Sequence, residues 1–339
     1  MFKLQTIHFW KLHIPLKVAF KHAAATRDTT ESIWAEVTDE QGGVGYGESC
    51  PRAYVTGETL DSCHQFFLTH RQDLLERITT PEDLREWAEE HRAEIDQAPA
   101  AWCAIELAVL DLFARRNGAS VETLLGLPGL EGPFHYTAIL GDQEDDSFRA
   151  QLRKYRDWGF EDFKVKLSGN PERDALKMSW LSDAGVLRHR VRVDANNLWA
   201  SASEALAHLA PLASGFFAVE EPLKGNMYDE MRLLNDSLRT PVILDESFLR
   251  AEQFARIDAD ASCWWINLRV SKMGGLFRSI EIAKLAAEKG IRLIVGAQVG
   301  ETSLLTRAAL TVAQFAAHNL NAQEGAYGTL LLQSDVTEP

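Results

Sequence analysis

The stretch Phe163-Lys164-Val165-Lys166-Leu167 begins the pattern that decides the fold. Three acidic stretches follow it at nearly constant spacing: VDANN (193–197), VEEP (219–222) and LDES (244–247). From Lys166 to Asp194 is 28 residues, and the next two steps between acids are 26 and 25 residues. A β/α unit of an eight-stranded barrel takes roughly 30 residues. Each step therefore moves one strand around such a barrel, and each charged side chain falls at the strand end where barrel enzymes build their active sites.

The second half of the chain alternates short apolar runs with amphipathic helical patterns from residue 133 onward. The expected strands are 134–140, 162–167, 190–194, 215–220, 242–245, 264–269 and 292–296. The expected helices include 146–157, 171–184, 201–210, 275–289 and 303–317. Strands separated by helices predict a parallel sheet, and seven or more such units predict closure into a barrel. A last irregular strand is expected within 320–335, followed by a return toward the N-terminal part.

The first part of the chain is different in character. Residues 1–45 are β-rich, and the glycine cluster 42–47 is interpreted as hairpin-turn glycine rather than a phosphate-binding loop. Residues 100–116 form a mostly apolar helix that carries Glu106 and Asp111. These two acids lie on different helix faces, so we interpret them as polar contacts where two domains meet rather than as a catalytic pair.

Bulk composition excludes several classes of function. The 339 residues carry 35 basic and 49 acidic side chains, a formal net charge of −14, and no basic stripe. Nucleic acid and anionic membrane surfaces are therefore not expected as partners. The four cysteines are scattered without a CxxC pair, and no run of 18 apolar residues occurs. Together with an N-terminus that reads as a strand rather than a signal peptide, this predicts a cytoplasmic protein.

Two lysines are the first chemically informative side chains. Lys164 and Lys166 are two apart in a strand, so both point into the predicted barrel. Two ammonium groups buried together would lower each other's pKa, and a nearby metal ion would add to this effect. Lys166, nearer the strand end, is the better candidate for a general base. Lys164 would lie deeper and touch a metal-bound carboxylate.

Three carboxylates at successive strand ends predict a metal site. Asp194, Asp245 and either Glu220 or Glu221 would repel one another unless a cation sat between them. Oxygen ligands without histidine or cysteine favour Mg²⁺ over zinc. A lysine base beside Mg²⁺ suits removal of the proton α to a carboxylate, because the metal and cationic side chains stabilise the ene-diolate that forms.

At these residues the chain resembles the enolase superfamily, specifically the muconate-lactonizing subgroup that includes muconate cycloisomerases and dipeptide epimerases. The shared motifs are Lys-x-Lys, DANNLW (194–199), VEEP, LDES, INLRVSKMGGL (266–276), GYGES (45–49), YVTGET (54–59) and DLFARRNGASVETLLG (111–126). The resemblance covers nearly the whole chain. It implies a modified (β/α)7β barrel over 129–320, an N-terminal α+β capping domain over 1–128, and a segment 321–339 that returns toward the cap. It also implies that Glu220 is the metal ligand.

One departure from the family pattern bears on the reaction. The second catalytic lysine of the family lies in an Asn-x-Lys pattern, which here reads Asn267-Leu268-Arg269. Lys272 belongs to a separate Lys-x-Gly-Gly element and is expected to point elsewhere. Arginine holds its proton and is a poor general base, although it can stabilise an enolate or grip two oxygens.

A single lysine base favours a lyase, a dehydratase in particular, or a cycloisomerase. The alternative is an epimerase or racemase of dipeptides or N-acylamino acids. A second alternative is a barrel that binds metal and ligand without turnover.

The remaining candidates are contacts to a small-molecule carboxylate substrate. The cap loops are expected to cover the barrel mouth, so that Arg27 (or Lys21) meets a distal anionic group and Tyr54 packs on the substrate. Gln298 and Glu301 follow the seventh strand. Glu301 is equally well interpreted as an acid at a helix N-terminus. The family often forms symmetric assemblies, so the resemblance leaves room for a homo-oligomer.

Overall fold

In the computed structural model the described residues are 3–22, 25–212 and 215–337, and for 18–22 and 25–27 the description covers the backbone alone. The N-terminal part is an α+β domain. Its strands are β1 (Leu4–Leu12), β2 (Pro15–His22), β3 (Ala25–Thr29), β4 (Ser32–Asp39) and β5 (Val44–Ser49). Its helices are α1 (Leu60–Arg77), α2 (Pro81–Glu90), α3 (Arg92–Gln97), α4 (Pro99–Arg116) and α5 (Val121–Leu125). β1, β4 and β5 form an antiparallel sheet, and β2 pairs with β3.

The glycines of β5 explain how closely helix α4 packs on the sheet. A Cβ atom at Gly47 would lie 2.0 Å from the carbonyl oxygen of Ala104, and one at Gly45 would lie 2.2 Å from that of Ala108. Only residues without a side chain allow this approach. The turn interpretation of the cluster holds for Gly42, whose φ is 77°. Gly45 and Gly47 correct it, because they serve helix packing within a strand.

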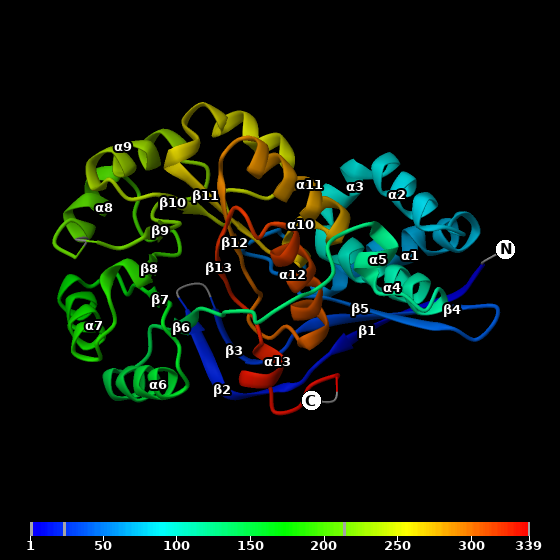
Figure 1. Ribbon diagram of the computed structural model, residues 1–339, viewed down its shortest axis with the longest axis horizontal. Helices are drawn as coiled ribbons and strands as arrows, with labels where there is room; N and C mark the ends of the chain where they lie inside the picture. The colour runs from blue at the N-terminus through cyan, green and yellow to red at the C-terminus, as the bar shows by residue number, and fades with distance from the viewer. Residues whose placement is uncertain (1–2, 23–24, 213–214, 338–339) are drawn as a thin grey trace.

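Eight parallel strands form the second domain (Figure 1). They are β6 (Ala138–Leu140), β7 (Phe163–Lys166), β8 (Val191–Asp194), β9 (Ala218–Glu220), β10 (Val242–Leu244), β11 (Trp264–Leu268), β12 (Arg292–Val295) and β13 (Leu320–Gln323), hydrogen-bonded in chain order. Thr137, just before β6, donates its backbone N–H to the carbonyl oxygen of Gln323 at 2.7 Å and so joins the two outer strands. The predicted fold, a modified (β/α)7β barrel with an α+β cap, is confirmed.

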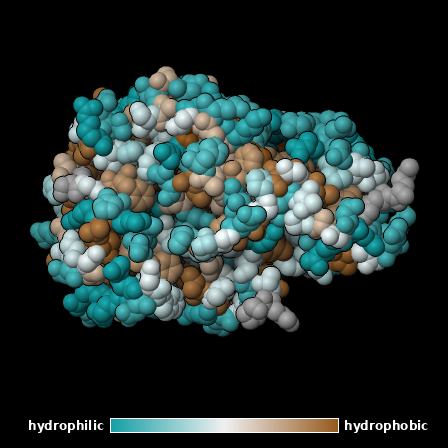
Figure 2. Space-filling model, in the orientation of Figure 1, coloured by the Kyte–Doolittle hydropathy of each residue, from teal (hydrophilic) through white to brown (hydrophobic). Residues whose placement is uncertain are grey.

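Helices cover the outside of the barrel, and Figure 2 shows a mainly hydrophilic surface on the face in view. They are α6 (Asp145–Asp157), α7 (Pro171–Asp183), α8 (Ala202–Leu209), α9 (Tyr228–Leu238), α11 (Gly275–Glu288) and α12 (Ser303–Phe315). Two short helices, α10 (Val270–Met273) and α13 (Tyr327–Leu330), follow β11 and β13. Short 3₁₀ segments are η1 (Arg188–Arg190), η2 (Ala251–Arg256) and η3 (Asp258–Cys263). Among the described residues, none of the helices has the length and apolar character needed to span a membrane.

Buried carboxylates of the cap attach it to the barrel helices. Glu106 of α4 accepts hydrogen bonds from the backbone N–H groups of Leu276 and Phe277 in the first turn of α11. Glu48 of β5 accepts from the N–H of Thr302, at the start of α12, at 2.9 Å. A helix N-terminus favours such negative groups. The interpretation of Glu106 as a domain contact is therefore confirmed, whereas Asp111 contacts Tyr46 and Arg115 within the cap.

The C-terminal segment runs back to the N-terminal strands. Lys17 donates its N–H to the carbonyl oxygen of Leu331 at 2.7 Å, and Gln333 donates to that of Pro15 at 2.9 Å. Leu332 packs with Ile14 and Leu16 in a small apolar cluster. This contact is the return that the sequence predicted, while the boundaries at residues 128 and 320 stay predictions.

Candidate active site

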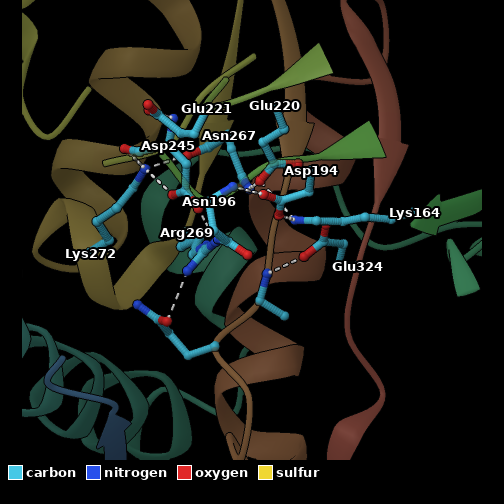
Figure 3. A network of polar contacts seen from close by, with 12 residues as sticks. Lys164, Asp194, Asn196, Glu220, Glu221, Asp245, Asn267, Arg269, Lys272 and Glu324 are labelled. Carbon is cyan, nitrogen blue, oxygen red and sulfur yellow. Dashed lines mark hydrogen bonds and ion pairs between the residues drawn. The ribbon is translucent and has the colours of Figure 1, made fainter. Parts of the chain in front are cut away.

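Strand register brings the charged side chains to one level inside the barrel. Lys166 is paired with Asp194 across β7 and β8, and Asp194 is paired with Glu220 across β8 and β9. Asp245 follows directly after β10. Figure 3 shows the side chains of Asp194, Glu220 and Asp245 converging from neighbouring strands. The spacing in the sequence therefore translates into one buried cluster.

Lys164 lies at the bottom of this cluster and is only 2% exposed. Its ammonium nitrogen is 2.7 Å from Glu220 Oε1, 2.9 Å from Asp194 Oδ2 and 3.2 Å from Glu324 Oε1. Burial opposes the charged form, but these three carboxylates outweigh it and raise the pKa of Lys164 well above its usual range. The expectation that neighbouring lysines would lower its pKa is wrong here, because carboxylates surround it more closely than other cations do.

Lys166 reaches the wall of the central cavity. Its ammonium nitrogen donates to Asp194 Oδ2 at 2.5 Å and to Asn196 Oδ1 at 2.8 Å. Its backbone carbonyl oxygen accepts from Lys177 Nζ at 2.9 Å. Lys166, the candidate base, is therefore held in place at its backbone by the strand and Lys177, and at its ammonium group by two side chains.

The carboxylates differ in what they face. Glu220 points inward, and its Oε2 atom is buried with no hydrogen-bond partner among the described residues. Glu221 accepts from the N–H groups of Asp245 and Ser247 at 2.6 and 2.8 Å, so it is engaged with the loop after β10. This arrangement favours Glu220 over Glu221 as a metal ligand, as the family resemblance implies.

The arrangement of the acidic side chains decides whether a metal ion fits this site. Within the described part of the chain, no three acids stand as they would around a bound ion. Lys164 lies between Asp194 and Glu220, and Arg269 lies against Asp245. The chemistry nevertheless fits a hard divalent cation, because three carboxylates come from adjacent strands and one buried carboxylate oxygen, Glu220 Oε2, has no hydrogen-bond partner among the described residues.

Arg269 follows β11 and crosses toward the same cavity. Its guanidinium contacts Asp245 Oδ2 and donates to Gln298 Oε1 at 3.0 Å. Burial works against its charge, yet the surrounding carboxylates, Asp245 first, raise its pKa above the usual range. Arg269 therefore stays protonated in this site.

Lys272 is placed differently from the expectation. Its ammonium nitrogen donates to Asp245 Oδ1 at 2.9 Å, to the carbonyl oxygen of Asp245 at 2.7 Å and to that of Asn267 at 2.6 Å. It does not point elsewhere, because helix α10 begins immediately after Arg269 and puts residues three apart on one face. Lys272 thus fixes the position of Asp245, one of the candidate metal ligands.

The cavity between these groups measures about 30 Å³. Both lysines, Arg269 and Gln298 line it, and so does Tyr54, which is 38% exposed at the mouth. Glu301 does not line the cavity. It accepts from the N–H of Gln298 at 2.9 Å and from the hydroxyl of Thr306 in α12 at 3.1 Å, and burial raises its pKa to about 8. It therefore links Gln298 to α12, and its contact with a substrate stays a prediction. The side chains of Arg27 and Lys21 lie outside the described residues.

Two further buried charged residues of the site, Arg192 and Glu324, were not identified from the sequence. Arg192 of β8 is buried, contacts Glu324 after β13, and lies 3.5 Å from Glu220 Oε2. Arg192 stands two residues before Asp194 in the same strand, so strand periodicity alone places both inside the barrel. Glu324 had no such signal, because its partners are more than 100 positions earlier in the chain.

The fold and site together define a capped barrel protein with lysines and carboxylates gathered at the strand ends. Residues 4–126 match the family described as mandelate racemase / muconate lactonizing enzyme, N-terminal domain, and residues 147–339 match the enolase C-terminal domain-like family. The chain therefore belongs to the enolase superfamily, in its muconate-lactonizing type of subgroup.

Three of the proteins to which the chain is similar are epimerases or racemases. It is 30% identical to an L-Lys-D/L-Arg epimerase of Methylococcus capsulatus, over 92% of this chain and 86% of that protein. It is 23% identical to an N-succinyl-L-Arg/Lys racemase of Bacillus cereus, over 92% and 84%. The crystal structure of a dipeptide epimerase from Enterococcus faecalis, complexed with Mg and L-Leu-L-Tyr, superimposes with a TM-score of 0.89 at 25% identity, covering 99% of this chain and 93% of that one.

Proposed function

We propose that this protein is a Mg²⁺-dependent enzyme that removes the proton α to the carboxylate of a dipeptide or an N-acylated amino acid, with Lys166 as the base. One observation carries the proposal. Lys166 from β7 and Arg269 from β11 line the same buried cavity, and the candidate metal ligand Asp194 holds the lysine at 2.5 Å. The relatives support the substrate class and the metal, since one of them is an epimerase crystallised with both Mg and a dipeptide.

Each residue has a distinct role in this proposal. Asp194, Glu220 and Asp245 would hold Mg²⁺, which when bound would stabilise negative charge on the substrate carboxylate. Lys166, after losing a proton from Nζ to solvent, accepts the α proton at that atom. Arg269 keeps its protons and donates hydrogen bonds to the oxygens on which charge develops. Lys164 supplies a fixed positive charge at the bottom of the cluster, next to Asp194 and Glu220.

Two outcomes follow from the loss of the α proton. Return of a proton to the other face inverts the α carbon, and the relatives, which are epimerases and a racemase, support this outcome. The second candidate is one-base lyase chemistry, as in a dehydratase or cycloisomerase. Arg269 favours that candidate, because a guanidinium with a raised pKa is a poor proton donor and acceptor.

The test is α-hydrogen exchange in D₂O with Mg²⁺, followed by NMR and chiral chromatography. The panel would contain L-Arg-L-Lys, L-Leu-L-Tyr and N-succinyl-L-arginine. Exchange with inversion supports the epimerase, whereas exchange with retention or loss of a β substituent supports the lyase. Lys166→Ala should abolish exchange while circular dichroism stays unchanged. Wild-type exchange rates in Lys166→Ala would remove the base assignment, and a wild type that exchanges nothing would leave only a binding protein.

A further inference from the structure

Tyr327 has a buried side chain, and its hydroxyl has no role in the reaction proposed above. It is the first residue of α13, directly beyond β13, and only 7% of it is exposed. Its Oη atom has no hydrogen-bond partner among the described residues. A buried hydroxyl left unpaired costs free energy, so native proteins rarely keep one without a purpose.

The position of Tyr327 indicates what that purpose is. Tyr327 lines the cavity that also contains Lys166 and Arg269. Together with Ile139 it also lines an adjoining cavity of about 30 Å³ with apolar and aromatic walls. In that second cavity the hydroxyl of Tyr155, by contrast, accepts a hydrogen bond from Gln151 at 2.9 Å. Tyr327 therefore stands at the junction of the reactive centre and an apolar side chamber.

The topology places Tyr327 on the side of the barrel away from Asp245. Strand β13 is three strands away from β10, and Asp245 follows β10. If the carboxylate of the substrate lies near the metal-ligand candidates, the other substituents of the α carbon extend toward Tyr327. In a dipeptide or N-acylated amino acid one of them carries an amide carbonyl on the α nitrogen. Burial raises the pKa of the Tyr327 phenol well above its usual range, so the hydroxyl keeps its proton and can donate.

We propose that the Tyr327 hydroxyl donates a hydrogen bond to the amide carbonyl oxygen of the substrate and thereby selects N-acylated amino acids and peptides over simple amino acids. This assignment rests on the proposed function. It makes Tyr327 a specificity-determining residue.

The test compares Tyr327→Phe with the matched control Tyr155→Phe. Both variants remove one hydroxyl and keep the ring. We expect Tyr327→Phe to raise KM for the N-acyl or dipeptide substrate about ten- to a hundredfold with little change in kcat, the usual effect of losing one hydrogen bond to a ligand. Tyr155→Phe should leave KM within about twofold. An unchanged KM in Tyr327→Phe overturns the proposal.

A chemical control identifies the acceptor atom. N-alkyl amino acids have the same length as N-acyl ones but lack the carbonyl. Calorimetric titration should show that wild type prefers the N-acyl ligand about tenfold or more, and that Tyr327→Phe loses this preference. A preference that survives in the variant means that another group reads the carbonyl, and the proposal fails. So does a wild type that binds no member of the panel.

A third measurement does not depend on activity. Because the hydroxyl is unpaired in the free protein, Tyr327→Phe without ligand should unfold at the wild-type melting temperature or above it. Tyr155→Phe should melt slightly lower. A clear drop for Tyr327→Phe would show that the hydroxyl has a structural partner, and would overturn the inference even if α-hydrogen exchange is found. Loss of the proposed function alone would instead appear as ligand binding without exchange.

Discussion

Replacing Glu106 with glutamine should change how the stability of the protein depends on pH. Two effects compete at this fully buried carboxylate. Burial disfavours its charge, while the N–H groups of Leu276 and Phe277 and the indole N–H of Trp102 donate to it and favour the charge. Burial dominates and raises the pKa of Glu106 from 4.5 to about 7.

The sign and size of the effect follow from that pKa. Between pH 4.5 and 7 the folded state binds a proton that the unfolded state has lost, so stability falls as pH rises through this range. Each pH unit of the difference is worth about 1.36 kcal/mol, which gives a total loss of about 3.4 kcal/mol. Most of it, about 2.5 kcal/mol, falls between pH 5 and 8. Glu106→Gln cannot titrate and should not show this loss.

The assay is urea unfolding of both proteins at pH 5, 6, 7 and 8, followed by tryptophan fluorescence. The free energy of unfolding of the wild type should fall relative to Glu106→Gln as the pH rises. Glu122→Gln is the matched control, because Arg307 and Thr311 hold the pKa of that buried glutamate at about 2, below the measured range. Parallel profiles for wild type and Glu106→Gln would show that the helix N-terminus wins over burial, and would refute the reasoning.

Three further predictions concern the site and the cap. Asp245→Asn should weaken Mg²⁺ binding in calorimetry about tenfold or more and abolish α-hydrogen exchange, since one charge leaves the ligand set; equal affinity would remove Asp245 from that set. Arg269→Lys should raise the ratio of inversion to retention in D₂O, because lysine can titrate; a lower ratio would make Arg269 itself the second proton carrier. Gly47→Ala should lower stability by about 3 kcal/mol in urea unfolding, because its Cβ would meet the Ala104 carbonyl oxygen at 2.0 Å; a neutral effect would show that α4 can shift.

The sequence predicted the parts of the fold that depend on local periodicity. The alternation of strands and helices was sufficient for the barrel, and the spacing from Lys166 through Asp194 was sufficient to bring the lysines and carboxylates together. The helix predictions were accurate because their ends carry strong local signals, such as Asn170 followed by Pro171 at the start of α7.

The parts that were missed depend on contacts between distant segments. Lys272 was misplaced because its direction follows from a four-residue helix that is too short to show a period. Glu324 and Tyr327 were missed because no motif marks them, and only closure of the sheet brings them to Lys164 and Ile139. Gly45 and Gly47 looked like turn residues because sequence alone does not reveal that a helix crosses above them.

The hydrogen bond between Thr137 and Gln323 has a consequence for how the protein folds while the ribosome synthesises it. Gln323 is synthesised 186 residues after Thr137, and until then the outer edge of the first barrel strand is unpaired. An unpaired strand edge can pair with the wrong strand or with another chain. The same late segment brings Glu324, the counter-charge of Lys164 and Arg192, and then the residues that anchor Pro15 and Lys17. We therefore expect the barrel to close only after residues 320–333 have been synthesised.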